Sequence, residues 1–174
     1  MATEHLIELG HRRIALIAGP KEYSLSGWRI DGWRAAMDAA GLSTEGLLER
    51  GDFGFASGDR AARTLLQLDE PPTAIVASSD KMALATLEAA RAFGMTVPDD
   101  LSLISFDNTP TARFTHPPLT AIDQPIAETV ARAVELIIAA QSGEDGPDEP
   151  VVVPGSLVLR QSTAPPPSVS PHAD

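Results

Sequence analysis

The chain has 174 residues, enough for one domain with a substantial core, and 43% of them are hydrophobic, as is ordinary for a globular protein. Its 24 acidic and 13 basic residues give a formal net charge of −11, which disfavours binding of this chain itself to nucleic acid. Cysteine is absent, which excludes disulfides and thiolate chemistry. No segment reads as a signal peptide, and no apolar run has the length of a membrane span. We therefore expect a cytoplasmic protein without membrane contact.

Short apolar runs alternate with amphipathic stretches along the first two thirds of the chain. The run RIALIAG predicts a strand buried on both faces, and Ile30, Trp33, Met37 and Ala40 share one face of the helix that follows, which ends at Gly41. In chain order we expect a helix at 2–11, a strand at 13–19, a helix around 30–40, a weaker strand at 47–54, a helix at 57–68 capped by Ser57, a strand at 73–79, a helix at 80–94 capped by Ser79 or Asp80, and a strand at 101–107. This order predicts a doubly wound parallel α/β sheet.

The pattern changes after residue 107. Residues 116–125 are extended and rich in proline, and residues 126–141 predict a helix with Ile126, Val130, Ala133 and Ile137 on one apolar stripe. Residues 143–150 form an acidic loop, and residues 151–163 predict a strand pair or a strand bent near Pro154. The composition of residues 164–174 is typical of a disordered tail.

The predicted strands end in side chains that suit a small polar ligand. In a parallel sheet, ligands bind beyond the carboxyl ends of the strands. The side chains delivered there include two aromatics, one arginine, several hydroxyls and a carboxylate: Trp28, Phe53, Arg29, Ser78, Ser79 and Asp107. This mixture favours a small polyol or a polar ring, because an aromatic covers an apolar face while charged groups bond to hydroxyls.

Each of these residues also has a structural interpretation. Asp107, before Asn-Thr-Pro, is equally well a turn former, a catalytic group or a ligand clamp. Ser79 is typical of a helix cap, Phe53 of the core, and Arg29 of an exposed helix face. The sequence has no nucleophile elbow and no phosphate-binding Walker loop, and its four histidines lack metal-ligand spacing and suit surface or cap positions. We expect no catalytic residues, no metal and no cofactor.

Six segments, in this order, carry a resemblance to a known family: ATEHLIELGHRRIALIAGP, RIDGWRAAMDAAGL, GDFGFASG, PPTAIVASSDKMALATLEAARAFGMTVPDDLSLISFDNTP, PPLTAIDQP and LVLRQST. The chain resembles the effector-binding domain of LacI/GalR-type bacterial transcription regulators from residue 2 to about residue 163. The resemblance implies a type I periplasmic-binding-protein-like fold, in which two α/β halves enclose a ligand cleft.

The resemblance also implies roles for particular residues. Arg29 matches the effector-contacting arginine, Phe53 the aromatic that stacks on the effector, and Asp107 the acidic residue that bonds its hydroxyls or ring nitrogens. Ser79 stands where many members have asparagine, and Gln124 often faces the cleft. With Trp28, these residues form the predicted ligand site, and Asp107 is then a clamp and not a catalyst.

The chain resembles only the C-terminal part of such a regulator. We expect a partial effector-binding and dimerisation domain over 1–163, with crossover segments at about 117–155, and no helix-turn-helix domain. Operator DNA would be bound only through that missing N-terminal domain. Residues 108–119 and the helix after Ser79 resemble homodimer-interface positions. The apolar stripe of the helix at 126–141 should then pack on its own half-domain or on a neighbouring chain.

These features predict an effector-sensing module for a sugar or a related polar metabolite. Two alternatives stay open at this stage. One is a periplasmic sugar-binding protein of a transport system, which shares the fold. The other is an enzyme built on an α/β sheet.

Overall fold

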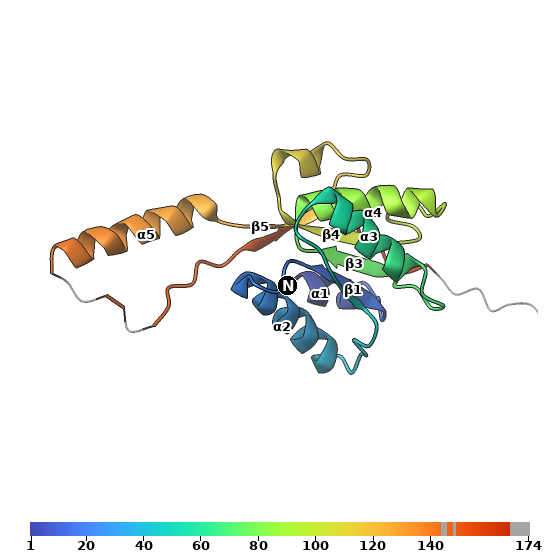
Figure 1. Ribbon diagram of the computed structural model, residues 1–174, viewed down its shortest axis with the longest axis horizontal. Helices are drawn as coiled ribbons and strands as arrows, with labels where there is room; N and C mark the ends of the chain where they lie inside the picture. Colours follow the sequence, from blue (N-terminus) through green and yellow to red (C-terminus); the bar gives the residue numbers. More distant parts are fainter. Residues whose placement is uncertain (144–145, 148, 168–174) are drawn as a thin grey trace, which may run out of the picture.

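The computed structural model describes residues 1–143, 146–147 and 149–167. It contains one six-stranded sheet with the order β2-β1-β3-β4-β5-β6 (Figure 1). All neighbouring strands are parallel except the last pair, β5 and β6, which is antiparallel. The strands are β1 (Ile14–Ala18), β2 (Leu48–Arg50), β3 (Ala74–Ala77), β4 (Ser102–Asp107), β5 (Thr120–Asp123) and β6 (Ser156–Val158).

Helices cover both faces of the sheet. Helices α1 (Ala2–Glu8) and α2 (Ser24–Ala39) pack against each other on one face, and α3 (Phe55–Leu66) and α4 (Asp80–Ala92) pack on the other. The strand order reverses direction between β1 and β3, which is the position where doubly wound folds bind ligands. The predicted fold class is therefore confirmed.

The central strands are fully buried, which explains their unbroken apolar sequences. Every residue of β1 and of β3 is buried, as expected for parallel strands covered on two faces. The indole nitrogen of Trp33 donates a hydrogen bond of 3.1 Å to the carbonyl of Ile14, which joins α2 to β1. The largest fully buried side chains of the core come from both faces: Leu6, Ile14, Leu16, Ile17, Met37, Leu47, Leu65, Ile75, Met82, Leu101, Leu103 and Ile104.

The boundaries of α4 and α5 agree with the prediction to within two residues, but α2 begins at Ser24, well before residue 30, and α1 ends at Glu8, before residue 11. The predicted cap at Ser57 was also wrong. Helix α3 begins two residues earlier, at Phe55, after the N-cap residue Gly54. The Ser57 hydroxyl instead donates to the Asp52 carboxylate at 2.5 Å and accepts the backbone N–H of Asp52 at 2.9 Å. Ser57 therefore fixes the turn that leads into the helix, and its side chain is buried there.

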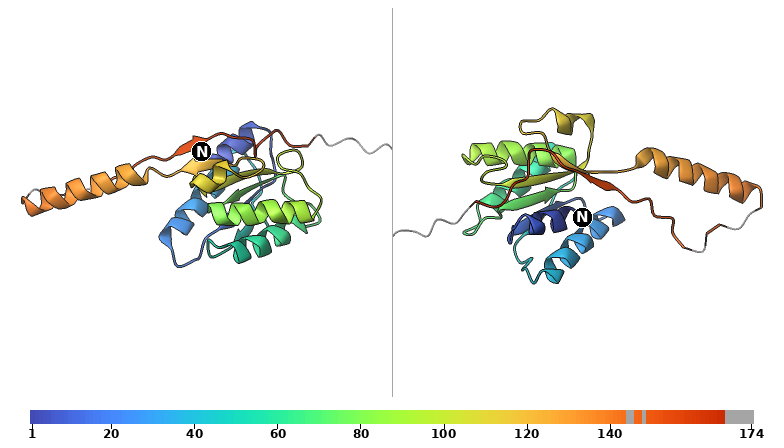
Figure 2. Two further views of the ribbon diagram at one scale, coloured as in Figure 1. Left: turned by 90° about the horizontal axis from the view of Figure 1, so that it is seen from above. Right: turned by 180° about the vertical axis from the view of Figure 1, so that it is seen from behind.

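Helix α5 (Ile126–Gln141) extends away from the body and buries none of its residues (Figure 2). Its apolar stripe is exposed, with 64% of Ile126 and 58% of Ile137 accessible. The expectation that this helix packs on its own half-domain was wrong, because both chain segments that flank it lead outward from β5 and β6. Packing on a neighbouring chain stays a prediction.

The C-terminal segment stays in contact with the body of the protein for more residues than its composition predicts. Only β6 forms in the region predicted as a strand pair, and it pairs with β5 through three residues. Beyond it, the carbonyl of Ala164 accepts hydrogen bonds from the His11 ring and the Ser102 hydroxyl. The predicted tail at 164–174 was therefore placed too early, and residues 168–174 lie outside the described residues.

His11 is buried, which corrects the expectation of a surface or cap role. It is 1% exposed, and its ring contacts Thr73, Ser102 and Ala164. Because the Ala164 carbonyl only accepts, Nε2 of His11 carries the proton and Nδ1 accepts from the Thr73 hydroxyl at 2.8 Å. Burial lowers the pKa of His11.

None of the described helices is long and apolar enough to cross a membrane.

Candidate functional site

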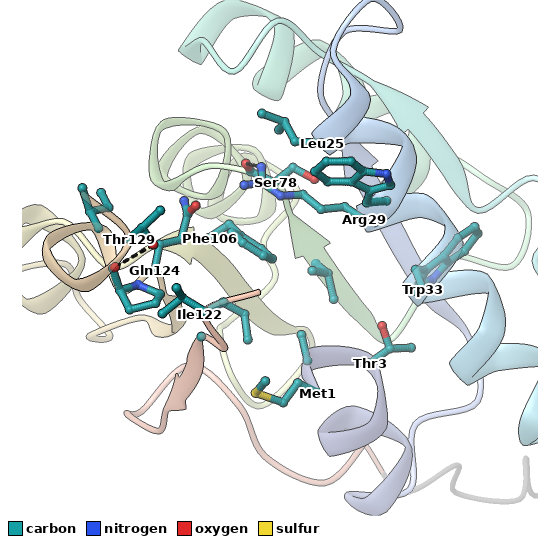
Figure 3. Close-up of a pocket in the computed structure, with 18 of the residues that line it drawn as sticks. Met1, Thr3, Leu25, Arg29, Trp33, Ser78, Phe106, Ile122, Gln124 and Thr129 are labelled. Atoms are coloured by element: carbon teal, nitrogen blue, oxygen red, sulfur yellow. Dashed lines mark hydrogen bonds between the residues drawn. The ribbon is translucent and has the colours of Figure 1, made fainter. Parts of the chain in front are cut away.

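Arg29 reaches from α2 across the carboxyl end of the sheet. Its guanidinium donates a 2.8 Å hydrogen bond to the carbonyl of Ser78, which follows β3. The guanidinium carbon lies 3.9 Å from the centre of the Phe106 ring on β4 (Figure 3). Burial lowers the pKa of Arg29, and the nearby charge of Asp107 acts in the opposite direction. The arginine is thus held, charged and half-buried, at the carboxyl ends of β3 and β4.

Phe53 forms one wall beside this arginine. Its backbone is left-handed, with φ of 66°, and its ring centre lies 5.9 Å from the guanidinium carbon of Arg29. A Cβ atom at Gly19 would lie 2.0 Å from the ring, so the glycine after β1 is what admits Phe53 to this position. Tyr23 packs edge-on against the ring at 6.1 Å between centroids.

Ser79 supports Phe53 and caps α4. Its hydroxyl donates to the Phe53 carbonyl at 3.1 Å and accepts the backbone N–H of Met82 at 3.2 Å. The side chain is buried. In this structure, Ser79 therefore orients an aromatic wall of the site, and its hydroxyl is engaged in that task.

Asp107 ends β4 with its carboxylate beside Gln124. The amide of Gln124 donates a hydrogen bond of 2.6 Å to Oδ1 of Asp107. Burial first, and then the charge of Asp80, raise the pKa of the Asp107 carboxyl. Arg29, the Asp80 backbone and Gln124 lower it in part. This carboxylate is costly to ionise, and it is available to accept hydrogen bonds from a ligand that compensates its desolvation.

Asp80 and Thr109 fix the loop after β4. One carboxylate oxygen of Asp80 accepts both the backbone N–H and the hydroxyl of Thr109, each at 2.7 Å. The carboxylate also stands near Asp107, since it is one of the causes of the raised pKa of that group. Among the described residues, no group of three or more metal-ligating side chains forms a metal site.

A cavity of about 580 Å³ opens beside Arg29 (Figure 3). Its polar residues include Arg29, Ser78 and Gln124, and most of the remaining lining is apolar. The Ser78 hydroxyl is buried and has no hydrogen-bond partner among the residues that the structure describes. Trp28 lies at the rim with 73% of its surface exposed. Such a volume suits a small molecule that presents both apolar and hydroxyl-bearing surfaces.

The structure brings four of the predicted residues together and gives the other two peripheral positions. Arg29 and Gln124 line the cavity, with Trp28 at its rim. Phe53 and Asp107 lie outside that lining, next to Arg29 and Gln124 respectively, and Ser79 stands behind Phe53. Sequence reasoning did not include Phe106 in the site. Its place one residue before Asp107, at the end of a predicted strand, was the available signal.

The sequence also matches known proteins. The family described as periplasmic binding protein-like domain matches residues 3–163. The chain belongs to this family. Its relatives within the periplasmic binding protein-like family are regulators of the LacI type, so the predicted resemblance is confirmed.

Three relatives illustrate the match. The transcriptional repressor CytR of Escherichia coli strain K12 is 39% identical over 163 residues, which cover 93% of this chain and 48% of the repressor. The solved complex of the transcriptional regulator CelR with cellobiose is 37% identical, has a TM-score of 0.86, and matches 92% of this chain and 49% of that one. A dimeric Lac repressor with a C-terminal deletion is 31% identical with a TM-score of 0.87, and the match covers 95% of this chain and 60% of that one. The chain spans about half the length of the curated relatives it matches.

Proposed function

We propose that this chain is the effector-sensing part of a LacI-type transcription regulator, and that its effector is a sugar or a related small polar metabolite. The observation that carries the proposal is the grouping of a half-buried arginine, a carboxylate and an amide between aromatic rings at the carboxyl edge of the sheet. The relatives are transcription regulators and not enzymes, which favours sensing over catalysis.

Each group has a distinct part in binding such an effector. Arg29 donates hydrogen bonds to ligand oxygens, and Asp107 accepts them from ligand hydroxyls. Phe53 covers an apolar ligand face, Trp28 closes the rim, and Gln124 adds a donor and an acceptor beside Asp107. A relative crystallised with cellobiose supports a carbohydrate as the class of ligand.

The regulatory step is a shift of population. An effector that binds one arrangement of the two halves of the domain better than the other changes their equilibrium and, through it, the dimer. Operator DNA is bound by a separate DNA-binding domain in the cytoplasm. This chain does not bind DNA itself, since its net charge is −11.

The dimer interface proposed for this chain runs along α4 and residues 108–119. A groove of about 1360 Å³ there is lined by α3, α4 and the loop that contains His116. Phe114 in the adjacent loop is 86% exposed. Large aromatic side chains are usually covered, so this exposure favours a partner surface over the loop. Sedimentation of the wild type and of Phe114→Asp tests this interface. We expect the substitution to lower the dimer fraction, and an unchanged dimer would contradict the interface.

Calorimetric titration with a panel of monosaccharides, disaccharides including cellobiose, and nucleosides tests the effector site. We expect a member of the panel to bind the wild type, and Arg29→Ala to abolish that binding. Arg34→Ala is the matched control, because Arg34 is an exposed arginine on the same helix. Equal losses in the two variants, or a panel without a binder, would overturn the proposal.

A further inference from the structure

The turn that carries Asp107 has a strained backbone. Among the described residues, three that are not glycine have positive φ: Phe53 at 66°, Asp107 at 105° and Asn108 at 55°. All three lie at the candidate site, and two of them are adjacent. Such conformations cost roughly 1–3 kcal/mol each and persist only where surrounding contacts hold them. The contacts that hold this turn therefore decide where the Asp107 carboxylate points.

Asn108 uses both ends of its side-chain amide to hold the turn. Its Nδ2 donates a hydrogen bond of 2.7 Å to Oδ1 of Asp123, the last residue of β5. Its Oδ1 accepts a hydrogen bond of 2.5 Å from the Arg160 guanidinium. Arg160 in turn donates to the carbonyl of Leu119, just before β5. The amide thus joins the end of β4 to both ends of β5 and to the segment after β6.

Neighbouring contacts do not replace this amide. Gln124 bonds to the Asp107 carboxylate itself, and Asp80 bonds to Thr109 beyond the turn. Neither side chain bonds to Asn108, whose backbone, like that of Asp107, has a positive φ. Asparagine suits this position for two reasons: it tolerates positive φ, and its amide supplies both a donor and an acceptor.

We propose that Asn108 is a positioning residue of the effector site, which aims the Asp107 carboxylate by tying its turn to Asp123 and Arg160. The proposal rests on the proposed function for the role of Asp107 in binding. Asn108 itself does not touch the effector. Its contacts also link the effector carboxylate to the two segments that carry α5, since Asp123 precedes that helix and Arg160 follows it in the chain.

Asn108→Gly separates positioning from simple turn formation. Glycine adopts positive φ without strain. If Asn108 served only to form the turn, glycine would therefore replace it without loss of function. Glycine has no amide, so a positioning role is lost. The expected result is a displaced Asp107 carboxylate in a protein that still folds, with a melting temperature lowered by no more than the lost hydrogen bonds to Asp123 and Arg160 account for.

The position of the carboxylate is read by carbon-13 NMR of aspartate-labelled protein without any ligand. Asp107 is assigned by the signal lost in Asp107→Asn. In the wild type we expect it to titrate above an ordinary aspartate, and in Asn108→Gly to titrate nearer to the ordinary value. Asp100 is the internal reference, because its pKa is lowered by Thr96 and its titration should stay the same. An unshifted Asp107 titration in Asn108→Gly would overturn the proposal.

Reversal of the donor and acceptor supplies the rescue. Asn108→Asp alone sets a carboxylate against Asp123 and should displace Asp107. Combining it with Asp123→Asn lets the new carboxylate accept from the new amide and from Arg160, and should recover the melting temperature that Asn108→Asp loses. Failure of the rescue would contradict the bonded geometry. Because these titrations need no effector, their outcome is independent of whether the sugar panel yields a ligand.

Discussion

The Arg29 guanidinium stacks on the Phe106 ring at 3.9 Å while it donates to the Ser78 carbonyl at 2.8 Å. The ring supports one face of the cation, and the carbonyl fixes its rotation. An arginine held in this way loses less side-chain freedom on binding a ligand than one that moves in solvent. We therefore expect Phe106 to contribute to effector affinity by holding Arg29, even without contacting the effector.

Phe106→Leu should weaken effector binding by removing the aromatic face. Cation–π contacts contribute about 0.5–2 kcal/mol, so we expect an affinity loss of roughly 2- to 30-fold. Phe106→Tyr keeps the face and should bind nearly as well as the wild type. Calorimetric titration with the panel member that binds measures the affinities of both variants. Equal affinities in the leucine and tyrosine variants would refute the role of the ring.

Effector binding should depend on pH through Asp107. Its pKa is raised, first by burial and then by the charge of Asp80, so the carboxylate gains a proton at a higher pH than an ordinary aspartate. Because a protonated carboxyl is a poorer acceptor, affinity should fall as the pH decreases through that raised pKa. Folding stability has the opposite sign: the folded protein binds this proton more tightly, so this group adds stability as the pH falls toward the ordinary value.

Titrations of the wild type and Asp107→Asn between pH 4 and pH 8 check this prediction. The variant should bind more weakly at pH 8 and lose the dependence on pH. A wild-type affinity that does not change over this range would show that binding does not need the ionised form of Asp107.

His11 should make folding stability depend on pH near neutrality. Burial lowers its pKa in the folded protein, so the unfolded chain binds the proton more readily. The free energy of unfolding is therefore highest above the ordinary pKa of 6.5 and falls as the pH decreases below it. His5, whose pKa is also lowered by burial, acts in the same direction.

Calorimetric melting of the wild type and His11→Ala over pH 5 to 8 measures this effect. The variant removes the buried hydrogen bonds of His11 to Thr73 and Ala164, which should cost about 1–3 kcal/mol at pH 8. It should also reduce the dependence on pH. His116→Ala, at an exposed histidine, should leave both unchanged. A pH profile of His11→Ala that matches the wild type would exclude His11 as the cause.

The fold was largely predictable, because its signals are local and repeated. Buried strands such as β1 read as continuous apolar runs, and helices such as α4 have a cap and a terminal glycine. The exceptions depend on contacts between distant segments. His11 is buried by Ala164, 153 residues later, and no pattern in the sequence signals that pairing.

The sequence predicted which residues belong to the candidate site better than it predicted how they contact one another. The strand ends and the family resemblance identified Arg29 and Asp107, which the structure places near each other. Asn108 and Phe106 were not selected, because their roles follow from a left-handed turn and a stacking distance. Ser79 was selected for its position after a strand, but its hydroxyl bonds to Phe53.

Gly58 should tolerate no side chain. A Cβ atom there would lie 2.7 Å from the Cα of Met82, because α3 and α4 are in close contact. Gly58→Ala should lower the free energy of unfolding by about 1–3 kcal/mol, the usual cost of overpacking. Gly27→Ala is the control, since a Cβ at this helical position meets nothing within 4 Å and should stabilise α2 by roughly 0.5–1 kcal/mol. Chemical denaturation measures both, and equal stability of the two variants would exclude a close helix contact at Gly58.

Helix α5 adds no side-chain burial to the body of the protein. Isolated helices of about 12–15 residues are marginal in water, so the 16 residues of α5 form a cooperative unit separate from the sheet. Hydrogen exchange should follow the same division, with the amides of α5 exchanging by local fraying and those of β1 and β3 only by global opening. A partner that covers the stripe would then slow exchange across the whole helix, and the degree of protection would report directly on occupancy of that face.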